Sequence, residues 1–351
     1  MKTQVFTIQD PLAAADALSY AGDVLRQGGL VVFPTETVYG LGGDGTNPAA
    51  AAKIYAAKGR PSDNPLIIHV ADPADADAYA HTCELYFALA KAFMPGPLTV
   101  IMPKRENVPT SVTGGLDSVA VRCPSHPVAR ALIRAAGTCV AAPSANISGK
   151  PSPTEASHVI ADLDGKVDVI IDGGECEIGL ESTIVKISED EQGAPYLVLL
   201  RPGGITHDAL CCVCPRVDIA PAVAEKLAEN ERPLSPGMKY RHYAPSAPLV
   251  LLDGNPSAVL DFLRAEQAAK NCCVLCYNEE LDALSAGTCI PVGARDDLET
   301  QAKRLFAALR ESDTTQAEII YAHLPPMHGL GLALYNRMIR AAAHTVLKIQ
   351  G

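Results

Sequence analysis

Short apolar runs recur along the first 200 residues, and their lengths are typical of buried strands. The runs lie at 30–33, 66–70, 98–102, 119–122, 139–142, 167–171, 183–187 and 197–200. Between some of them, apolar residues repeat every three or four positions, which predicts helices near 12–27, 48–57, 84–94, 127–136 and 154–162. Because strands and helices alternate unevenly, the pattern predicts an α/β fold with a large twisted mixed sheet.

Four of the predicted strands run into a proline that small or polar residues follow. These strand ends are Phe33-Pro34, Arg122-Cys123-Pro124, Ala142-Pro143 and Arg201-Pro202. Proline cannot donate to a sheet ladder, and it stops a strand. Since α/β proteins commonly bind ligands in the polar loops at strand ends, these four ends form the candidate site.

The amino-acid composition of the chain changes between Pro215 and Pro248, where six prolines are interspersed with polar residues. Beyond this stretch, the pattern predicts strands at 249–252, 273–276, 290–292 and 319–322 and helices near 256–269, 297–311 and 331–347. A length of 351 residues also favours two domains over one. We therefore expect a first domain over 1–210, a proline-rich linker over 211–247 and a smaller, Rossmann-like α/β domain over 248–351.

Composition and charge narrow the range of functions that this protein can have. Apolar residues make up 48% of the chain and charged residues 20%, which excludes wholesale disorder. The formal net charge of −11 counts against tight, nonspecific binding to nucleic acid. The N-terminal segment lacks an apolar signal-peptide core, and no uncharged apolar run reaches about 18 residues. We therefore expect a soluble, cytoplasmic protein without a membrane segment.

The eleven cysteines predict reduced, buried thiols. Several lie in apolar runs, such as Cys139 and Cys272-Cys273. The pairs that suggest zinc, Cys273 with Cys276 and the 211–214 cluster, lack a second ligand pair at suitable spacing. Packing roles are therefore favoured over a metal site.

A glycine-rich segment, Gly40–Gly45, formally matches the dinucleotide-binding pattern GxGxxG. Its first glycine lies seven residues beyond the preceding strand, and no acidic residue ends a second strand about 20 residues later. We therefore interpret the segment as a glycine-rich turn. A nicotinamide-dependent oxidoreductase remains an alternative on this match, whereas the absence of GxxxxGK[ST] gives a Walker-type site no support.

The candidate site is rich in hydroxyls and cations but has no evident nucleophile. Lys58 and Arg60 flank a glycine on a loop that suits an oligophosphate, although a solvated basic turn explains them equally well. His69 lies among apolar residues and by itself indicates a core histidine. No Ser-His-Asp order and no HExxH motif occurs. These hydroxyl-bearing and cationic side chains favour a role in phosphoryl or nucleotidyl transfer, in which a protein positions the reactants and stabilises charge.

Six segments, taken in order, resemble the YrdC-type domain family. They are Phe33–Leu41, Lys58–Pro61, Pro95–Thr99, Ala142–Asn146, Glu181–Val185 and Leu200–Gly203. With the linker motif Pro236–Pro245 and a further α/β domain, the whole chain is similar to the two-domain L-threonylcarbamoyladenylate synthases. The resemblance is strong over about 28–245 and thinner beyond.

The resemblance implies an activity. L-threonine, bicarbonate and ATP would be converted into threonylcarbamoyl-adenylate and pyrophosphate, with Mg²⁺ assisting. Other, tRNA-modifying proteins would then use the adenylate to modify an adenosine beside the tRNA anticodon. No tight, direct nucleic-acid binding by this chain is expected.

The resemblance also implies roles for individual residues. The residues expected to hold threonine are Thr35, His69, Arg122 and Ser182. The residues expected to hold ATP are Lys58, Arg60, Thr113, Ser144, Asn146, Ser152, Arg201 and Tyr243. Lys58, Arg60 and Arg201 would act in catalysis, and Tyr243 would bring the linker over the active site. No motif indicates the metal ligands.

Two alternatives remain open at this stage. Arg122 could form a buried ion pair instead of binding the threonine carboxylate. A concave basic patch in the first domain could also make the protein a noncatalytic RNA-binding module.

Overall fold

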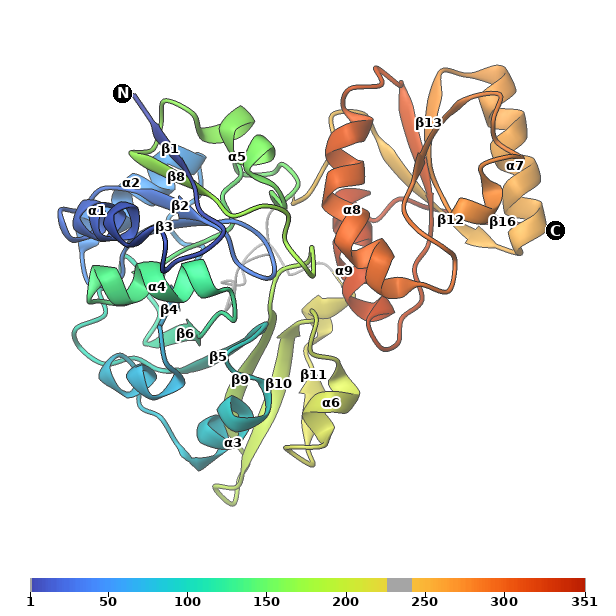
Figure 1. Ribbon diagram of the computed structural model, residues 1–351. Coiled ribbons are helices and arrows are strands. Elements are labelled where there is room, and N and C mark those ends of the chain that lie inside the picture. Colours follow the sequence, from blue (N-terminus) through green and yellow to red (C-terminus); the bar gives the residue numbers. More distant parts are fainter. Residues whose placement is uncertain (1, 226–241, 351) are drawn as a thin grey trace. The chain divides into compact units, whose positions relative to one another are not determined.

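The computed structural model describes residues 2–225 and 242–350, which form two compact units (Figure 1). Within the described residues, the first unit comprises 2–148, 153–177 and 181–225, and the second comprises 149–152, 178–180 and 242–350. The boundaries predicted from the sequence at 210 and 247 stay a prediction, because 226–241 lies outside the described residues.

The first unit contains an 11-stranded mixed sheet, in agreement with the sequence pattern. Its strands are β1 (Gln4–Thr7), β2 (Val31–Phe33), β3 (Gly40–Asp44), β4 (Ile67–His69), β5 (Leu98–Pro103), β6 (Ser118–Arg122), β7 (Val140–Ala141), β8 (Val169–Asp172), β9 (Thr183–Glu189), β10 (Pro195–Arg201) and β11 (Val217–Ile219). Their order is β1-β8-β2-β3-β7-β4-β6-β5-β9-β10-β11. The sheet combines parallel pairs such as β4 with β6 and antiparallel pairs such as β5 with β6, so strand ends from distant segments meet at one edge.

In the described part of the chain, six α-helices flank this sheet. They are α1 (Ala15–Arg26), α2 (Pro48–Lys58), α3 (Glu84–Phe93), α4 (Pro127–Ala136), α5 (Ala156–Leu163) and α6 (His207–Cys211), with 3₁₀ turns η1 (Pro73–Ala78) and η2 (Pro221–Val223). α1 and α4 pack against β1, β2 and β8 around a core of apolar side chains. A Cβ at Gly22 would lie 2.7 Å from the backbone of Ala135, so the close approach of α1 to α4 requires glycine there.

The interpretation of the glycine-rich segment as a turn was wrong, because Gly40–Asp44 is strand β3, antiparallel to β2. A Cβ at Gly42 would lie 2.8 Å from the Val140 side chain and 2.9 Å from that of Phe33. The lack of a side chain at Gly42 therefore leaves space for the side chains of Val140 and Phe33. A dinucleotide-binding loop would need these glycines in the turn between a strand and a helix, so the structure does not support that motif.

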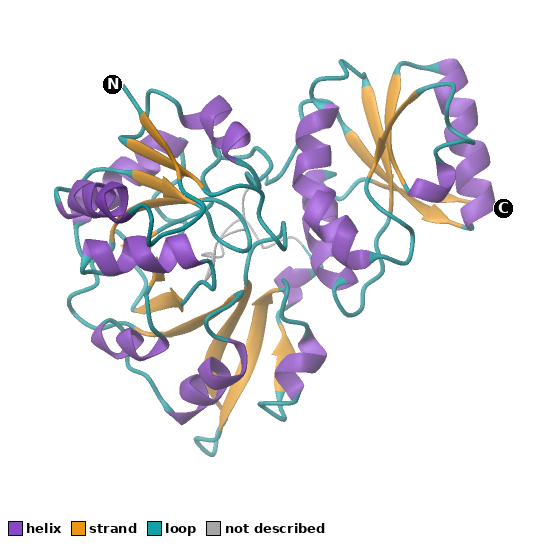
Figure 2. Cartoon of the chain, in the orientation of Figure 1, coloured by secondary structure: helices purple, strands orange, loops and turns teal. Residues whose placement is uncertain are grey.

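The second unit contains a five-stranded sheet in which every strand pair is parallel. Its strands are β12 (Leu249–Gly254), β13 (Cys272–Cys276), β14 (Thr288–Pro291), β15 (Ile319–His323) and β16 (Val346–Ile349), in the order β14-β13-β15-β12-β16. Helices α7 (Pro256–Ala269), α8 (Leu298–Ser312) and α9 (Gly331–Ala341) cover both faces, and η3 (Asn278–Glu280) follows β13 (Figure 2). This layered parallel arrangement matches the predicted Rossmann-like domain.

Three short edge strands differ from the sequence-based expectation. The predicted helix 331–347 ends at Ala341, because Ala343 and His344 adopt positive φ values of 48° and 65°, and the chain then forms β16. β1 and β11 were not expected, and β11 lies within the stretch predicted as linker. Edge strands bury few side chains and thus carry a weak apolar signal. Among the described residues, no helix is long and apolar enough to cross a membrane.

Candidate functional site

A buried ion pair joins two of the predicted strand ends. Arg122, the last residue of β6, places Nη2 2.7 Å from Oε1 of Glu36, which follows β2, and both side chains are 4% exposed. The backbone N–H of Ser125 donates to the other carboxylate oxygen at 3.2 Å. Nε of Arg122 is buried and has no hydrogen-bond partner among the described residues. The ion pair and a ligand-binding role for Arg122 are therefore compatible, because the pair leaves one donor unused.

His69 ends β4 and lies opposite Arg122 in the register of the two strands. Its side chain is 3% exposed, and Nδ1 lies 3.2 Å from the carbonyl oxygen of Ile67. Burial, followed by the positive charge of Arg122, lowers the pKa of His69 from 6.5 to about 3. The imidazole is therefore neutral at physiological pH, which favours hydrogen bonding over charge pairing at this position.

Ser182 and Arg201 meet on the other side of Arg122. Arg201 donates from Nε to the carbonyl oxygen of Ser182 at 3.0 Å and from Nη2 to its hydroxyl at 3.1 Å. The Ser182 hydroxyl also lies 2.7 Å from that of Thr99, and Thr99 is the β5 partner of Arg122 in the sheet register. A chain of contacts thus runs from Glu36 through Arg122 and Thr99 to Ser182 and Arg201.

Thr35 precedes Glu36 and is held by local contacts. Its hydroxyl donates to the carbonyl oxygen of Val38 at 2.6 Å and lies 2.8 Å from the hydroxyl of Thr37. Thr35 is 2% exposed, so these bonds fix a hydroxyl beside the buried ion pair.

Lys58, Ser144 and Asn146 form a second group. Nζ of Lys58 donates to the carbonyl oxygens of Ser144, at 2.6 Å, and Asn146, and the hydroxyl of Ser144 donates to Oδ1 of Asn146 at 2.6 Å. Lys58 is 2% exposed, so the alternative of a solvated basic turn is wrong for this residue. Ser144 also bridges to Gly40, which connects this group to the segment that follows Thr35.

Arg60 and Thr113 lie in two neighbouring loops. Arg60 donates to the carbonyl oxygens of Asn64 at 3.3 Å and Pro65 at 3.0 Å, and Thr113 donates to that of Leu116 at 2.7 Å. The 60–66 and 110–116 loops touch, because a Cβ at residue 114 would lie 2.8 Å from the backbone oxygen of residue 63.

Ser152 and Tyr243 belong to the second unit and are described within it. Ser152 is fully buried, and the Tyr243 ring lies 5.1 Å from that of Phe306. The N–H of Ala244 donates to the carbonyl oxygen of Gly149 at 3.0 Å, so the two segments lie together. The remainder of the linker motif up to residue 241 lies outside the described residues.

Two polar residues of the site were missed in the sequence. Glu36 stands inside the strand-end motif, yet a carboxylate directly beside a threonine reads as an exposed loop residue. Thr99 is a β-branched residue in a predicted strand and gives no signal of its own. A pairing of Glu36 with Arg122, 86 positions apart, is visible only in the fold.

No group of three or more potential metal-binding side chains (His, Cys, Asp, Glu) occurs within the described parts of the chain. The side chains of Lys58, Ser144, Asn146, Ser182 and Arg201 supply cations, hydroxyls and an amide. The site is therefore suited to an anionic ligand.

We predict that Glu36→Ala destabilises the protein by about 3–5 kcal/mol, because it leaves the guanidinium of Arg122 buried without its carboxylate. The free energy of unfolding from denaturant titration checks this. Glu191→Ala, at an exposed position in the turn after β9, serves as the control and should cost less than about 0.5 kcal/mol. Equal stability of the two variants would show that the pair is not a structural requirement.

We also predict a pH dependence that comes from His69. Below about pH 6.5 the unfolded chain binds a proton on this histidine, whereas the folded protein does so only near pH 3. Stability is therefore lost as the pH falls through this window, by roughly 1.4 kcal/mol per pH unit. Between about pH 6.5 and pH 5, the His69→Gln variant should lose about 2 kcal/mol less stability than the parent protein. His81→Gln, at an exposed position, should lose as much stability as the parent protein. Parallel stability curves for His69→Gln and the parent protein would contradict the assignment.

Comparisons with known proteins agree with this architecture. Residues 23–203 match the family Sua5_yciO_yrdC, described as "Telomere recombination", and residues 205–343 match Sua5_C, described as "Threonylcarbamoyl-AMP synthase, C-terminal domain". A Bacillus subtilis protein named threonylcarbamoyl-AMP synthase is 44% identical over 99% of this chain and 100% of its own length. A Pyrococcus abyssi protein of the same name is 44% identical over 94% of this chain and 95% of its own.

Among solved structures, the crystal structure of P. abyssi Sua5 complexed with L-threonine superposes with a TM-score of 0.90 at 41% identity, covering 99% of this chain and 100% of that one. Both parts of the chain and their order are therefore shared with these relatives. The chain belongs to the Sua5 family, whose members join a Sua5/YciO/YrdC domain to a threonylcarbamoyl-AMP synthase C-terminal domain.

Proposed function

We propose that this protein is a threonylcarbamoyl-AMP synthase that forms its product from L-threonine, bicarbonate and ATP and releases pyrophosphate. The observation that carries the proposal is the 44% identity, over essentially the whole chain, to a relative of that name. The match to a structure that holds L-threonine supports the choice of amino acid. Because this reaction transfers the AMP group of ATP to another molecule, the protein would be a nucleotidyltransferase.

Arg122, Thr35, Ser182 and His69 are proposed to hold threonine. A guanidinium with a spare buried donor suits the amino-acid carboxylate, and Glu36 fixes its orientation. Thr35 and Ser182 supply hydroxyls to either side of that guanidinium. The neutral ring of His69 adds a hydrogen-bonding group without repelling the threonine ammonium.

Lys58, Arg60 and Arg201 are proposed to hold the phosphates of ATP and to stabilise charge on the departing pyrophosphate. Carbonyl contacts hold the ammonium of Lys58 beside Ser144 and Asn146, which are proposed to bind the nucleotide together with Thr113. Arg201 touches Ser182, so one cation connects the threonine group to the phosphate group. Ser152 and Tyr243 are proposed as further ATP contacts, with Tyr243 closing the linker over the site.

The chemistry divides into two steps. The threonine amine and bicarbonate condense to a carbamate with loss of water. A carbamate oxygen then attacks the α-phosphorus of ATP, and pyrophosphate leaves. Carbamates are labile in water, so the buried position of Thr35, Arg122 and Ser182 would protect the intermediate. The protein's part is to position the reactants and stabilise charge.

Mg²⁺ is proposed to accompany ATP. Because no group of three or more candidate metal ligands occurs among the described residues, the ion would be held mainly by phosphate oxygens and water. It would supply charge neutralisation at the phosphates.

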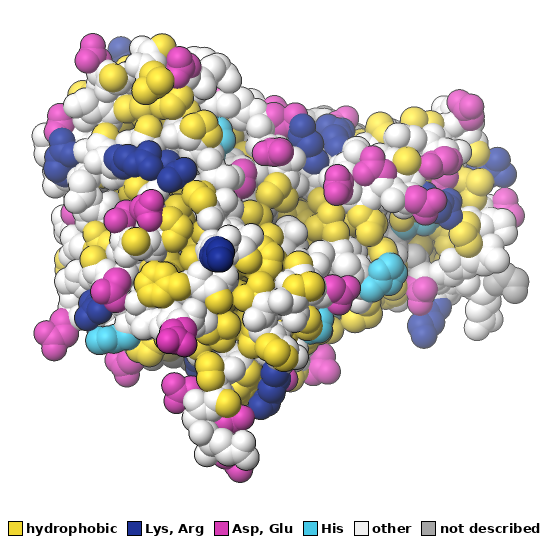
Figure 3. Space-filling model, turned by 60° about the horizontal axis from the view of Figure 1, so that its bottom comes forward, with side chains coloured by type: hydrophobic (Ala, Val, Ile, Leu, Met, Phe, Trp, Pro, Cys, Tyr) yellow, Lys and Arg dark blue, Asp and Glu magenta, His cyan; other side chains and the backbone are white. Residues whose placement is uncertain are grey.

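The proposed partners are tRNA-modifying proteins that consume the adenylate, in the cytoplasm. The alternative of an RNA-binding module needs a continuous basic surface. On the face drawn in Figure 3, the described Lys and Arg side chains lie in separate groups among Asp and Glu. With a net charge of −11, this distribution favours the enzyme.

Omission analysis tests the proposed function. Pyrophosphate release by the full chain should require ATP, threonine and bicarbonate together, and removal of either cosubstrate should abolish it. Release that continues without threonine would contradict the proposal. Tight tRNA binding with a steep salt dependence, without pyrophosphate release, would favour the RNA-binding alternative.

We predict that Lys58→Met lowers the rate of pyrophosphate release by roughly 10²–10³-fold, because it removes a positioned cation but keeps the buried stem. Loss of the hydrogen bonds from the ammonium to the Ser144 and Asn146 carbonyl oxygens should cost about 1–3 kcal/mol of stability, so folding is checked by thermal unfolding. Lys91→Met, at an exposed position on α3, is the matched control and should retain activity. A Lys58→Met variant with near-parental turnover would remove Lys58 from the catalytic group.

A further inference from the structure

A short piece of chain next to the proposed nucleotide contacts belongs to the second unit. Residues 149–152 closely follow Ser144 and Asn146 in the chain, and they end with Ser152, itself a proposed ATP contact. Residues 148–153, all within the described part of the chain, form neither helix nor strand, and Pro151 and Pro153 have no backbone N–H to donate. The position of Ser152 therefore depends on the contacts that 148–153 makes with other elements.

Both ends of the 148–153 segment are held within the first unit. The backbone N–H of Ser148 donates to the carbonyl oxygen of Lys58 at 2.9 Å, and the carbonyl oxygen of Pro153 accepts from the N–H of Tyr39 at 2.9 Å. Lys58 is proposed to bind the phosphates of ATP, and Tyr39 lies in the strand-end motif that carries Thr35. The ends of the segment are thus bound to two parts of the candidate site.

The middle of the segment is held within the second unit. Nη2 of Arg310 donates to the carbonyl oxygen of Pro151 at 2.6 Å, and the N–H of Ala244 donates to that of Gly149 at 3.0 Å. The bond from Arg310 is charge-assisted, so it is stronger than a bond between neutral groups. Because a peptide group is planar, holding the Pro151 carbonyl also fixes the N–H of Ser152, which is fully buried.

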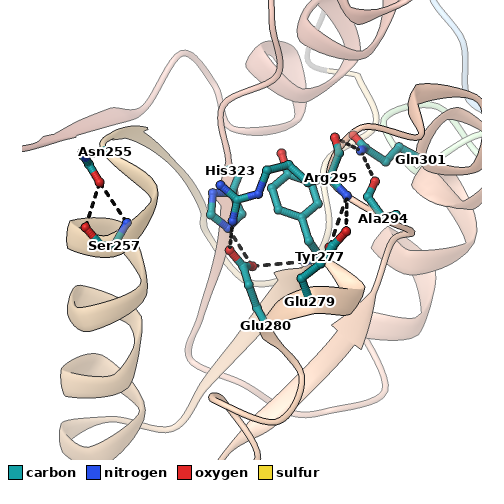
Figure 4. Close-up of polar contacts among 9 residues, drawn as sticks. All are labelled: Asn255, Ser257, Tyr277, Glu279, Glu280, Ala294, Arg295, Gln301 and His323. Atoms are coloured by element: carbon teal, nitrogen blue, oxygen red, sulfur yellow. Dashed lines mark hydrogen bonds and ion pairs between the residues drawn. The ribbon is translucent and has the colours of Figure 1, made fainter.

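Arg310 lies on a helix that is itself well anchored. Near the start of α8, Gln301 donates from Nε2 to the carbonyl oxygens of Ala294 at 2.7 Å and Arg295 at 2.9 Å (Figure 4). Near its end, Leu309, next to Arg310, is fully buried. The helix is therefore a rigid support for the guanidinium that holds Pro151.

We propose that Arg310 is a positioning residue for ATP binding and that it acts through the Pro151 carbonyl on Ser152. The second unit would thereby take part in binding the nucleotide. This role rests on the proposed function, in which Ser152 contacts ATP, and it extends that function to a residue that no sequence motif indicated.

The arrangement separates the two ligands. The described hydrogen bonds of Arg122 and Ser182, proposed to hold threonine, run to Glu36 and Thr99, which lie outside 148–153. Loss of the bond to Pro151 should therefore weaken ATP binding and leave threonine binding unchanged. A general loss of folding would weaken the binding of both ligands.

Isothermal titration calorimetry of the full chain tests this role, with ATP and Mg²⁺ in one titration and L-threonine in another. Arg310→Met removes the donor and keeps an apolar stem, so it should weaken ATP binding by about tenfold and leave the Kd of L-threonine within about twofold. Parental ATP affinity in Arg310→Met would overturn the proposal. Equal weakening of both ligands would also overturn it, because it would show a general structural role.

Arg264→Met is the matched control. Arg264, at an exposed position on α7, also donates to a backbone carbonyl oxygen, that of Ala283 at 3.2 Å, which lies outside 148–153. Its replacement should leave both titrations unchanged. Arg310→Lys, which keeps a cationic donor, should bind ATP more tightly than Arg310→Met.

A double-mutant cycle tests the route through Ser152. In a Ser152→Ala background, Arg310→Met should weaken ATP binding by less than about threefold, because the hydroxyl that it positions is already absent. The same tenfold loss in both backgrounds would contradict an effect through Ser152.

Binding and turnover together separate this role of Arg310 from the proposed function. A parent protein that binds ATP and threonine but releases no pyrophosphate would contradict the proposed function, and the calorimetric comparison would still decide the role of Arg310. Pyrophosphate release by the parent together with parental ATP affinity in Arg310→Met would contradict only that role. A parent protein that binds no ATP would overturn both.

Discussion

The buried pair of Glu36 and Arg122 is the constraint on which the candidate site depends. A guanidinium and a carboxylate removed from water are tolerated when they pair and when further hydrogen bonds satisfy their remaining atoms. Glu36 meets this condition with Arg122 and the N–H of Ser125. Arg122 meets it incompletely, because Nε has no partner among the described residues. That unused donor is the physical link between the fold and the proposed binding of an amino-acid carboxylate.

The same pair organises its neighbours. Burial and the charge of Arg122 together keep His69 neutral, and the sheet register places Thr99 between Arg122 and Ser182. Since β5, β6 and β9 are adjacent in the sheet, a displacement of Arg122 would be felt as far as Arg201. The polar groups of the site therefore act as one network whose members fix each other's positions.

The second unit solves a similar problem in a different way. Glu280 is buried at the edge of a parallel sheet and is satisfied by an arginine, a histidine and a backbone N–H from three strand ends. Here the carboxylate of Glu280 and the guanidinium of Arg295 compensate each other's charge.

The sequence by itself determined the α/β class, most helices and the strand ends at which polar residues follow proline, because apolar periodicity and proline act locally. It also pointed to Lys58, Ser144, Ser182 and Arg201 through their motifs. The tertiary structure decided that Gly40–Asp44 is a strand, that Lys58 is buried and that Arg122 pairs with Glu36. These features depend on which distant segments become neighbours in the sheet, and local patterns of apolar and polar residues do not specify that pairing.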